Sequence, residues 1–146
     1  MRKRLIRSNE GATMVELAIV LQILLIVLFA IGELGIALYD KAMLTNATRE
    51  GARAGIVAQD PRVTDGEIKS VVKKYLQDES GKDYLITFGA DILGDEDITI
   101  TKAGSSFGSD LTVSVNYRYD SLVLSRLIST LGGDITLNAT TVMKLE

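Results

Sequence analysis

The sequence predicts an α+β fold: one long N-terminal helix, followed by a small antiparallel sheet with one or two short helices. An apolar run, Leu17–Tyr39, is interrupted only by Gln22 and Glu33. Helical spacing continues beyond this run, and the only proline of the chain is Pro61. Strand-like alternation begins only after that proline. With 146 residues, the chain has room for one modest domain and an anchor.

Charge is distributed unevenly along the chain. The net charge is −3, but residues 1–11 hold four basic groups and one acidic group, which leaves 12 basic and 18 acidic groups in the remainder. This acidic body argues against nucleic acid as a partner, because phosphates require a positive face. The chain has no Cys, so no disulfide stabilises the domain, and it also lacks His and Trp.

The apolar run itself has three interpretations. As a transmembrane helix, Leu17–Tyr39 would span about 34 Å, against a hydrocarbon core of about 30 Å. As a secretory signal peptide, it has an apolar centre at Ile23–Ile31 and a poor cleavage site at Ala30-Ile31-Gly32. As a buried core helix, it would need a larger domain around it. The basic residues before the run fit both membrane interpretations and place the N-terminus in the cytoplasm.

Continuity of the helical pattern favours the transmembrane interpretation. A stripe at i, i+3 and i+4 continues past the apolar run through Leu34, Ala37, Leu38, Lys41, Ala42, Thr45 and Thr48. We therefore expect one helix over residues 12–58, about 70 Å long, which spans the membrane to about residue 39. Residues 1–11 form a basic leader, and residues 59–146 form an α+β domain.

The second half of this helix is rich in small residues. Ala47, Gly51, Ala54 and Gly55 make a smooth surface that another element could approach closely. Glycine inside a helix costs about 1 kcal/mol relative to alanine, so two within five residues indicate a packing requirement. The alternative is a merely solvated helix. Glu33, about 26 Å from Glu16 along the axis, is expected near the outer membrane interface, where it either meets solvent or contacts a neighbouring helix.

A second, shorter helix is expected after Pro61. Thr64 or Asp65 can cap its N-terminus, and Gly81 follows its end. Its buried stripe is predicted to comprise Ile68, Val71, Val72, Tyr75 and Leu76.

The remaining chain alternates in the manner of strands. Three runs fit this pattern: Tyr84–Phe88, Ile98–Lys102 and Leu111–Tyr119. In the last run, apolar and polar residues alternate, which predicts a half-exposed antiparallel strand. The apolar set is Leu111, Val113, Val115, Tyr117 and Tyr119.

The chain's last part is predicted to form one more helix and one more strand. Asp120 can cap a short apolar helix, Ser121–Leu131, which Gly132-Gly133 would end. Ile135–Leu145 then has the pattern of a final strand.

Candidate catalytic and metal-binding motifs do not hold up. The segment Gly104–Gly108 matches the letters of a nucleophile elbow, but it lies between two predicted strands and the chain has no His to activate a serine. A hairpin loop is the better interpretation. The acidic segment Asp91–Asp97 lacks EF-hand spacing and is expected to be a solvated turn. We expect no enzyme, no cofactor, no metal site and no small-molecule substrate.

Several motifs resemble a known family. The basic leader followed by Gly11 and Glu16 resembles a type IV-like prepilin. Leu44–Gly55, with the sequence LTNATREGARAG, resembles the TadE-like family, small pseudopilins of the tight-adherence (Flp-type) pilus system. Glu33-Leu34-Gly35 is similar to the Glu-Phe-Gly that ends the family's membrane segment. The stretch Leu131–Met143 resembles the family's Gly-Gly followed by a strand of small residues.

The resemblance implies a minor pilin-like subunit. A prepilin peptidase would cut between Gly11 and Ala12 on the cytoplasmic side of a bacterial inner membrane. Glu16 would then pair with the new α-amino group of a neighbouring subunit and set its axial register. The implied partners are that peptidase, other pilin or pseudopilin subunits, the inner-membrane assembly platform and the lipid bilayer. The domain would lie outside the cytoplasm.

Two alternatives from other classes remain open at this stage. One is a static single-pass anchor that displays an extracytoplasmic binding domain. The other is a secreted soluble domain cut near Gly32. The mature N-terminus separates the three: Ala12 for the pilin, Met1 for the anchor, and Glu33 or its vicinity for the secreted form.

Overall fold

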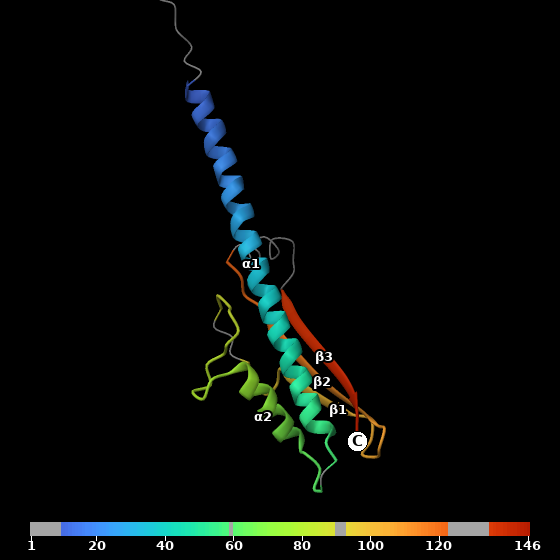
Figure 1. The fold of residues 1–146 in the computed structure, drawn as a ribbon. Coiled ribbons are helices and arrows are strands. Elements are labelled where there is room, and N and C mark those ends of the chain that lie inside the picture. The colour runs from blue at the N-terminus through green and yellow to red at the C-terminus, as the bar shows by residue number, and fades with distance from the viewer. Residues whose placement is uncertain (1–9, 59, 90–92, 123–134) are drawn as a thin grey trace, which may run out of the picture.

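The computed structural model describes residues 10–58, 60–89, 93–122 and 135–146, and its fold is α+β as predicted. These residues form two helices and a three-stranded sheet, and their arrangement is drawn in Figure 1. The helices are α1 (Glu10–Ile56) and α2 (Asp65–Leu76). The strands are β1 (Ile98–Lys102), β2 (Asp110–Arg118) and β3 (Thr136–Lys144).

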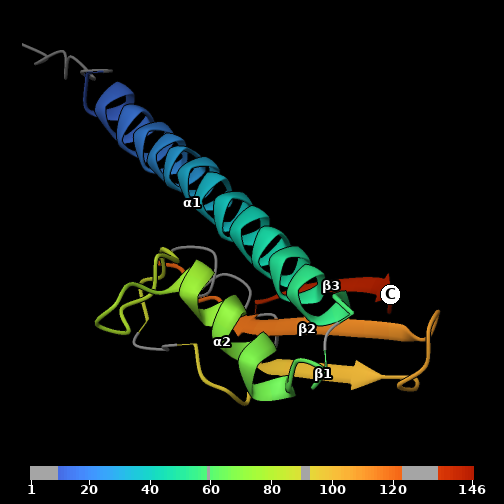
Figure 2. The same cartoon turned by 60° about the horizontal axis from the view of Figure 1, so that its bottom comes forward.

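Helix α1 has two distinct halves. It runs unbroken for 47 residues, which corresponds to about 70 Å. Figures 1 and 2 show its first half standing clear of the rest of the molecule and its second half lying along the sheet and α2. The predicted single helix over residues 12–58 is therefore confirmed within two residues at either end.

Helix α2 begins with a complete capping box. The Thr64 hydroxyl accepts a hydrogen bond from the Glu67 N–H, and the Glu67 carboxylate accepts one from the Thr64 N–H. This arrangement satisfies two amide donors at the helix start and confirms Thr64 as the N-cap. The buried stripe is narrower than predicted, because Tyr75 is exposed and Val71 is only half-buried. The fully buried residues are Ile68, Val72 and Leu76.

The sheet is antiparallel, with β2 in the centre. Val115 of β2 pairs with Ile98 of β1 on one side and with Ala139 of β3 on the other. The bounds of β1 are those predicted, and β2 and β3 agree within one residue at each end.

The predicted strand Tyr84–Phe88 is wrong, because this segment is irregular. Its backbone donors bond outside any strand ladder. The Ile86 N–H donates to the Asp40 carboxylate and the Phe88 N–H donates to the Asp120 carbonyl. Alternation here reflects attachment to α1 and to the end of β2, not strand pairing.

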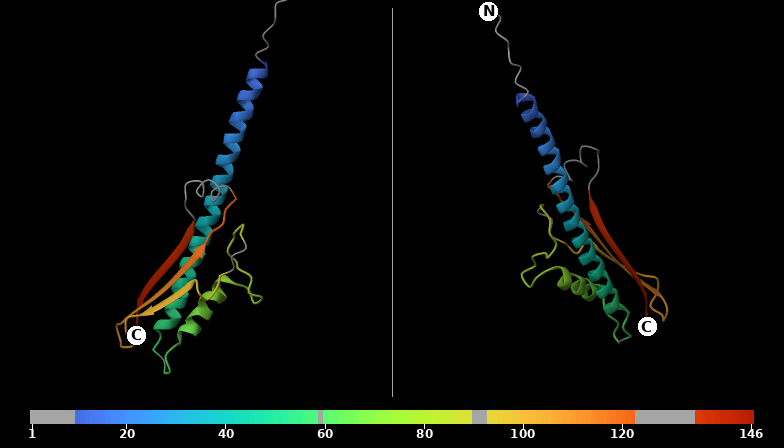
Figure 3. Two further views of the ribbon diagram at one scale, coloured as in Figure 1. Left: turned by 180° about the vertical axis from the view of Figure 1, so that it is seen from behind. Right: turned by 45° about the horizontal axis from the view of Figure 1, so that its top comes forward.

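The core lies between the sheet and the two helices, which cover the same sheet face (Figure 3). Strand β2 alternates as predicted, with every second residue buried from Leu111 to Tyr119. On the opposite face, Asn116 and Arg118 are exposed. Helix α1 contributes Leu44, Ala47 and Ala52 to this core, so its second half is part of the globular unit.

Some predictions fall outside the described residues. They concern most of the leader over residues 1–11, most of the helix Ser121–Leu131 with Gly132-Gly133, and the beginning of the acidic segment Asp91–Asp97.

Candidate functional site

The first half of α1, from its start to Gly32, is here called the bare half because its side chains project from the domain, and it is apolar on all sides. Between Met14 and Ile31, its large hydrophobic side chains are 44–74% exposed. The helix is long and apolar enough to cross a membrane, and none of its most apolar window is buried within the molecule. The buried-core-helix interpretation is therefore wrong. A helix that is hydrophobic all round requires an apolar surrounding, here supplied from outside the chain.

Gly11, Ala12 and Glu16, which were predicted to matter for processing and register, lie at the N-terminal end of the bare half. Gly11 is exposed in the first turn of α1, with open space where a side chain would stand. Ala12 and Glu16 are also exposed. Because they are four residues apart, they lie on one face of the helix, one turn from each other.

A polar junction joins α1 to the domain where the bare half ends. Glu33 is 5% exposed, and one of its carboxylate oxygens accepts a hydrogen bond of 2.7 Å from the Leu122 N–H. The Tyr119 hydroxyl donates to the Glu33 carbonyl at 3.3 Å. Two helical turns later, fully buried Asp40 accepts from the Ile86 N–H at 2.9 Å. Two carboxylates on one helix face therefore hold two chain segments that are distant in sequence.

The position of Glu33 corrects the sequence-based expectation. Neither solvent nor a neighbouring helix receives its carboxylate, which turns inward to its own domain. Asp40 was not singled out from the sequence at all. The seven-residue spacing between Glu33 and Asp40 places both on one helix face, and this spacing was the signal that could have identified the pair.

Asp40 lies beyond the bare half, in an environment that disfavours its charge. Burial raises the pKa of the Asp40 carboxyl, and the hydrogen bond from the Ile86 N–H only partly opposes this effect. Its second oxygen is buried without a hydrogen-bond partner among the described residues. Burial also raises the pKa of Tyr119, and the nearby charges of Asp40 and Glu33 raise it further.

The small residues of α1 allow α2 to approach closely. A Cβ at Gly51 would stand 2.5 Å from Val72 Cγ2 of α2. One at Gly55 would stand 2.7 Å from Ile68 Cδ1 of α2 and 2.6 Å from Leu111 Cδ2 of β2, so the sheet also approaches closely here. Ala47 is fully buried and Ala54 is half-buried. The face is thus used inside the chain, and a solvated helix does not describe it.

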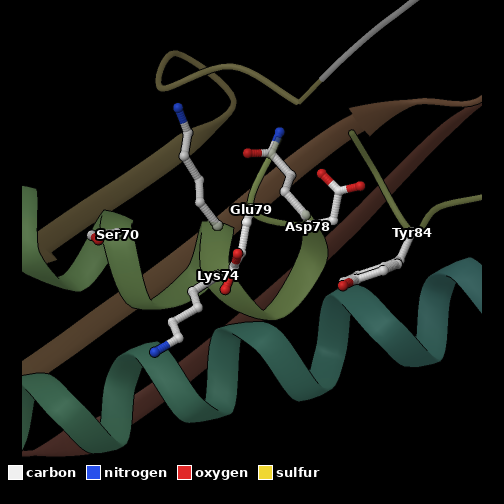
Figure 4. Close-up of a pocket in the computed structure, with 7 residues that line it drawn as sticks. Ser70, Lys74, Asp78, Glu79 and Tyr84 are labelled. Atoms are coloured by element: carbon white, nitrogen blue, oxygen red, sulfur yellow. The ribbon is translucent and has the colours of Figure 1, made fainter. Parts of the chain in front are cut away.

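The remaining surface features that the structure describes do not bring several reactive side chains together. A depression of about 610 Å³ lies between the end of α2 and the turn that follows, and Figure 4 shows its lining. Asp78 in this lining accepts hydrogen bonds from the Ser80 hydroxyl and the Lys82 N–H, which lower its pKa. It is therefore engaged in its own turn. In the part of the chain that the structure describes, no group of three or more His, Cys, Asp or Glu side chains could hold a metal ion.

The serine of the elbow-like segment also lies in a loop. Gly104–Gly108 belongs to the connection between β1 and β2, as predicted. The Ser106 hydroxyl lies 3.1 Å from the Ser109 hydroxyl within the same loop. Nothing in this geometry resembles a strand-to-helix nucleophile turn.

An exposed apolar helix that continues into a small α+β domain fits a single-pass membrane protein. The model of a family described as TadE-like protein matches residues 11–53, which is nearly the whole of α1, and this match confirms the resemblance seen in the sequence. The matched segment is therefore similar to this family. No curated protein and no solved structure shows a significant match to the chain.

Proposed function

We propose that the chain is a minor pilin-like subunit, or pseudopilin, of a tight-adherence, type IV-like pilus assembly, and that it serves pilus biogenesis, adhesion or secretion. One observation carries this proposal: the segment that matches the TadE-like family is a single helix, bare and apolar in one half and packed into a domain in the other.

The division of α1 suits a subunit that changes surroundings. Among the described residues, Glu33 is the first residue of α1 that is buried against the domain. The apolar half can therefore exchange lipid for neighbouring helices without any change inside the domain. Its large apolar surface is shielded from water both in the membrane and in a filament, because lipid chains and packed side chains are comparably apolar.

Processing is proposed at the Gly11–Ala12 bond by a prepilin peptidase. Open space around Gly11 leaves the scissile backbone accessible. Removal of the leader takes away four cations that hold the N-terminus at the cytoplasmic face. The domain then lies on the extracytoplasmic side of a bacterial inner membrane.

After cleavage, Glu16 gains a partner of opposite charge. We propose that it pairs with the α-amino group of Ala12 on a neighbouring subunit. In an apolar surrounding such a pair is strongly orienting, because an unpaired charge there is costly. The pair would fix how far one subunit stands along the filament axis from the next.

The test is the N-terminus of the mature protein after co-expression with a prepilin peptidase. A mature N-terminus at Ala12 supports the proposal. An N-terminus at Met1 would indicate the static anchor instead, and one near Glu33 would indicate the secreted domain. Gly11→Leu should accumulate as an uncut precursor. Gly35→Leu is the matched control, because Gly35 also faces open space.

A further inference from the structure

The apolar part of the bare half, taken alone, is shorter than the hydrocarbon core of a bilayer is thick. This inference rests on the membrane anchoring of the proposed function. From Leu17, just after Glu16, to Gly32, just before the junction, α1 has 16 residues. They span about 24 Å, whereas the hydrocarbon core is about 30 Å thick. About one further helical turn is needed, and that turn lies at the level of the junction.

The helix itself suits a lipid surrounding in this turn. Leu34 and Leu38 are 53% and 62% exposed. The acidic side chains of the same stretch, Glu33 and Asp40, point into the domain and are buried. The outward face of α1 is therefore apolar for at least another turn beyond Glu33.

The edge of the domain at this level is also apolar. Ile86, Phe88 and Leu122 are 47%, 49% and 57% exposed. Hydrogen bonds fix their height along α1, because the Ile86 N–H reaches Asp40 and the Leu122 N–H reaches Glu33. In Figure 1 both segments lie at the end of the domain nearest the bare half of the helix.

The charged groups close to this edge are compatible with a headgroup layer. Arg118 and Asp120 form an ion pair at 3.8 Å, and the Asp120 carbonyl accepts the Phe88 N–H. Lys41, one turn beyond the apolar stretch, donates to Asn138. The order along the molecule is thus apolar, then paired and polar, which is the order of a bilayer from its core outward.

We propose that this membrane-facing edge, formed by Leu34, Leu38, Ile86, Phe88 and Leu122, is seated in the interfacial layer of the lipid bilayer. The domain is then docked on the membrane surface, with its apolar edge supplying the length that the bare helix lacks. Apolar side chains at a membrane-bound face typically enter about 5–10 Å into the headgroup and acyl boundary. Extraction into a filament would have to withdraw this edge as well as the helix.

The chain has no Trp, so single tryptophans can report their depth. The full chain carrying Phe88→Trp or Leu122→Trp is reconstituted in phosphatidylcholine–phosphatidylglycerol vesicles at less than one copy per vesicle. The vesicles contain lipids brominated either near the headgroup or near the acyl-chain end. Phe107→Trp is the matched control, because Phe107 is 85% exposed in the β1–β2 loop, and Leu25→Trp reports the bare helix. Circular dichroism checks the fold of each variant.

The expected result is quenching of the tryptophans at positions 88 and 122 by the shallow bromines, with no quenching at position 107. The inference is overturned if positions 88 and 122 behave like position 107 while position 25 is quenched by the deep bromines; the proposed anchoring then still stands. Unquenched tryptophans at positions 88 and 122 whose emission shifts to the blue only at high protein density would assign the edge to a second copy of the chain, which also overturns it. An unquenched position 25 would remove the anchoring itself.

Discussion

The two halves of α1 form one continuous helix but have opposite surroundings. Leu24 in the first half is 59% exposed, whereas Leu44 in the second half is fully buried in the core. The first half has apolar residues on every side, and the second has a buried face of small and apolar residues with Arg49, Glu50 and Arg53 exposed on the outside. One secondary structure element is therefore exposed and apolar at one end and part of a core at the other.

The largest expected contrast between the halves comes from truncating a leucine in each. Leu44→Ala should lower the free energy of unfolding by about 2–5 kcal/mol, because it leaves a cavity between the helix and the sheet. Leu24→Ala removes the same atoms from the bare half and should leave the unfolding of the domain unchanged. Chemical denaturation of both variants in the same detergent measures the contrast. Equal losses would mean that the bare half contributes to the stability of the domain.

Adding a side chain at a glycine sharpens the same comparison. Gly51→Leu should destabilise the domain by about 1–3 kcal/mol, because the new atoms would collide with Val72 of α2. Gly32→Leu, where open space surrounds the backbone, is the matched control and should have little effect. Thermal unfolding followed by circular dichroism measures both. A melting temperature of Gly51→Leu equal to that of the parent chain would show that α2 can move away at no cost.

The junction between the halves can be tested through Glu33. Glu33→Ala should cost about 1–3 kcal/mol, because it leaves the Leu122 N–H without its acceptor. Glu33→Gln retains an acceptor oxygen and should lose less. Hydrogen exchange of the Leu122 amide reports the bond directly, and faster exchange in the alanine variant alone is the expected result. Unchanged exchange in both variants would mean that the junction does not hold this segment.

Most of the fold could be predicted because it follows local rules. The single helix, the Thr64 cap and the alternation in β2 each depend on residues close in sequence. The irregular segment Tyr84–Phe88 could not be predicted, because its backbone bonds reach Asp40 and Asp120, far away in the chain. Alternation alone does not distinguish a strand from a segment attached in this way.

The predicted site residues also divide into those that a local sequence pattern identifies and those whose role depends on distant contacts. Residues recognised by a local motif, Gly11 and Glu16, lie in the bare half and are exposed. The small face containing Gly51 was identified by composition, but its partner, α2, emerges only from the tertiary structure. The inward position of Glu33 depends on Leu122, which lies 89 residues further along the chain. The spacing of Glu33 and Asp40 marks a shared helix face, but no periodicity in the sequence identifies the distant partner of either carboxylate.

The smallest expected effect concerns Asp40 and the pH dependence of the junction. Burial raises the pKa of Asp40 above its ordinary value of 3.8, so the folded protein binds a proton more tightly than the unfolded chain. This group therefore favours the folded state most at acidic pH, and its contribution is lost as pH rises from about 3.8 through the higher pKa of the folded state. The capped and ion-paired carboxyls Glu67 and Asp95 have lowered pKa values and act in the opposite direction, so the total profile does not isolate Asp40.

The difference between two proteins does isolate it. Asp40→Asn keeps an oxygen that can accept the Ile86 N–H and carries no charge at any pH. Its free energy of unfolding should increase relative to that of the parent chain as pH rises from about 4 towards 7, because only the parent loses the contribution of Asp40. Tyr119 and Glu33 also face the junction, but they are present in both proteins and their effects largely cancel in the difference. A difference that stays constant over this range would show that Asp40 titrates alike in the folded and unfolded chain, and that the junction holds a charged carboxylate without penalty.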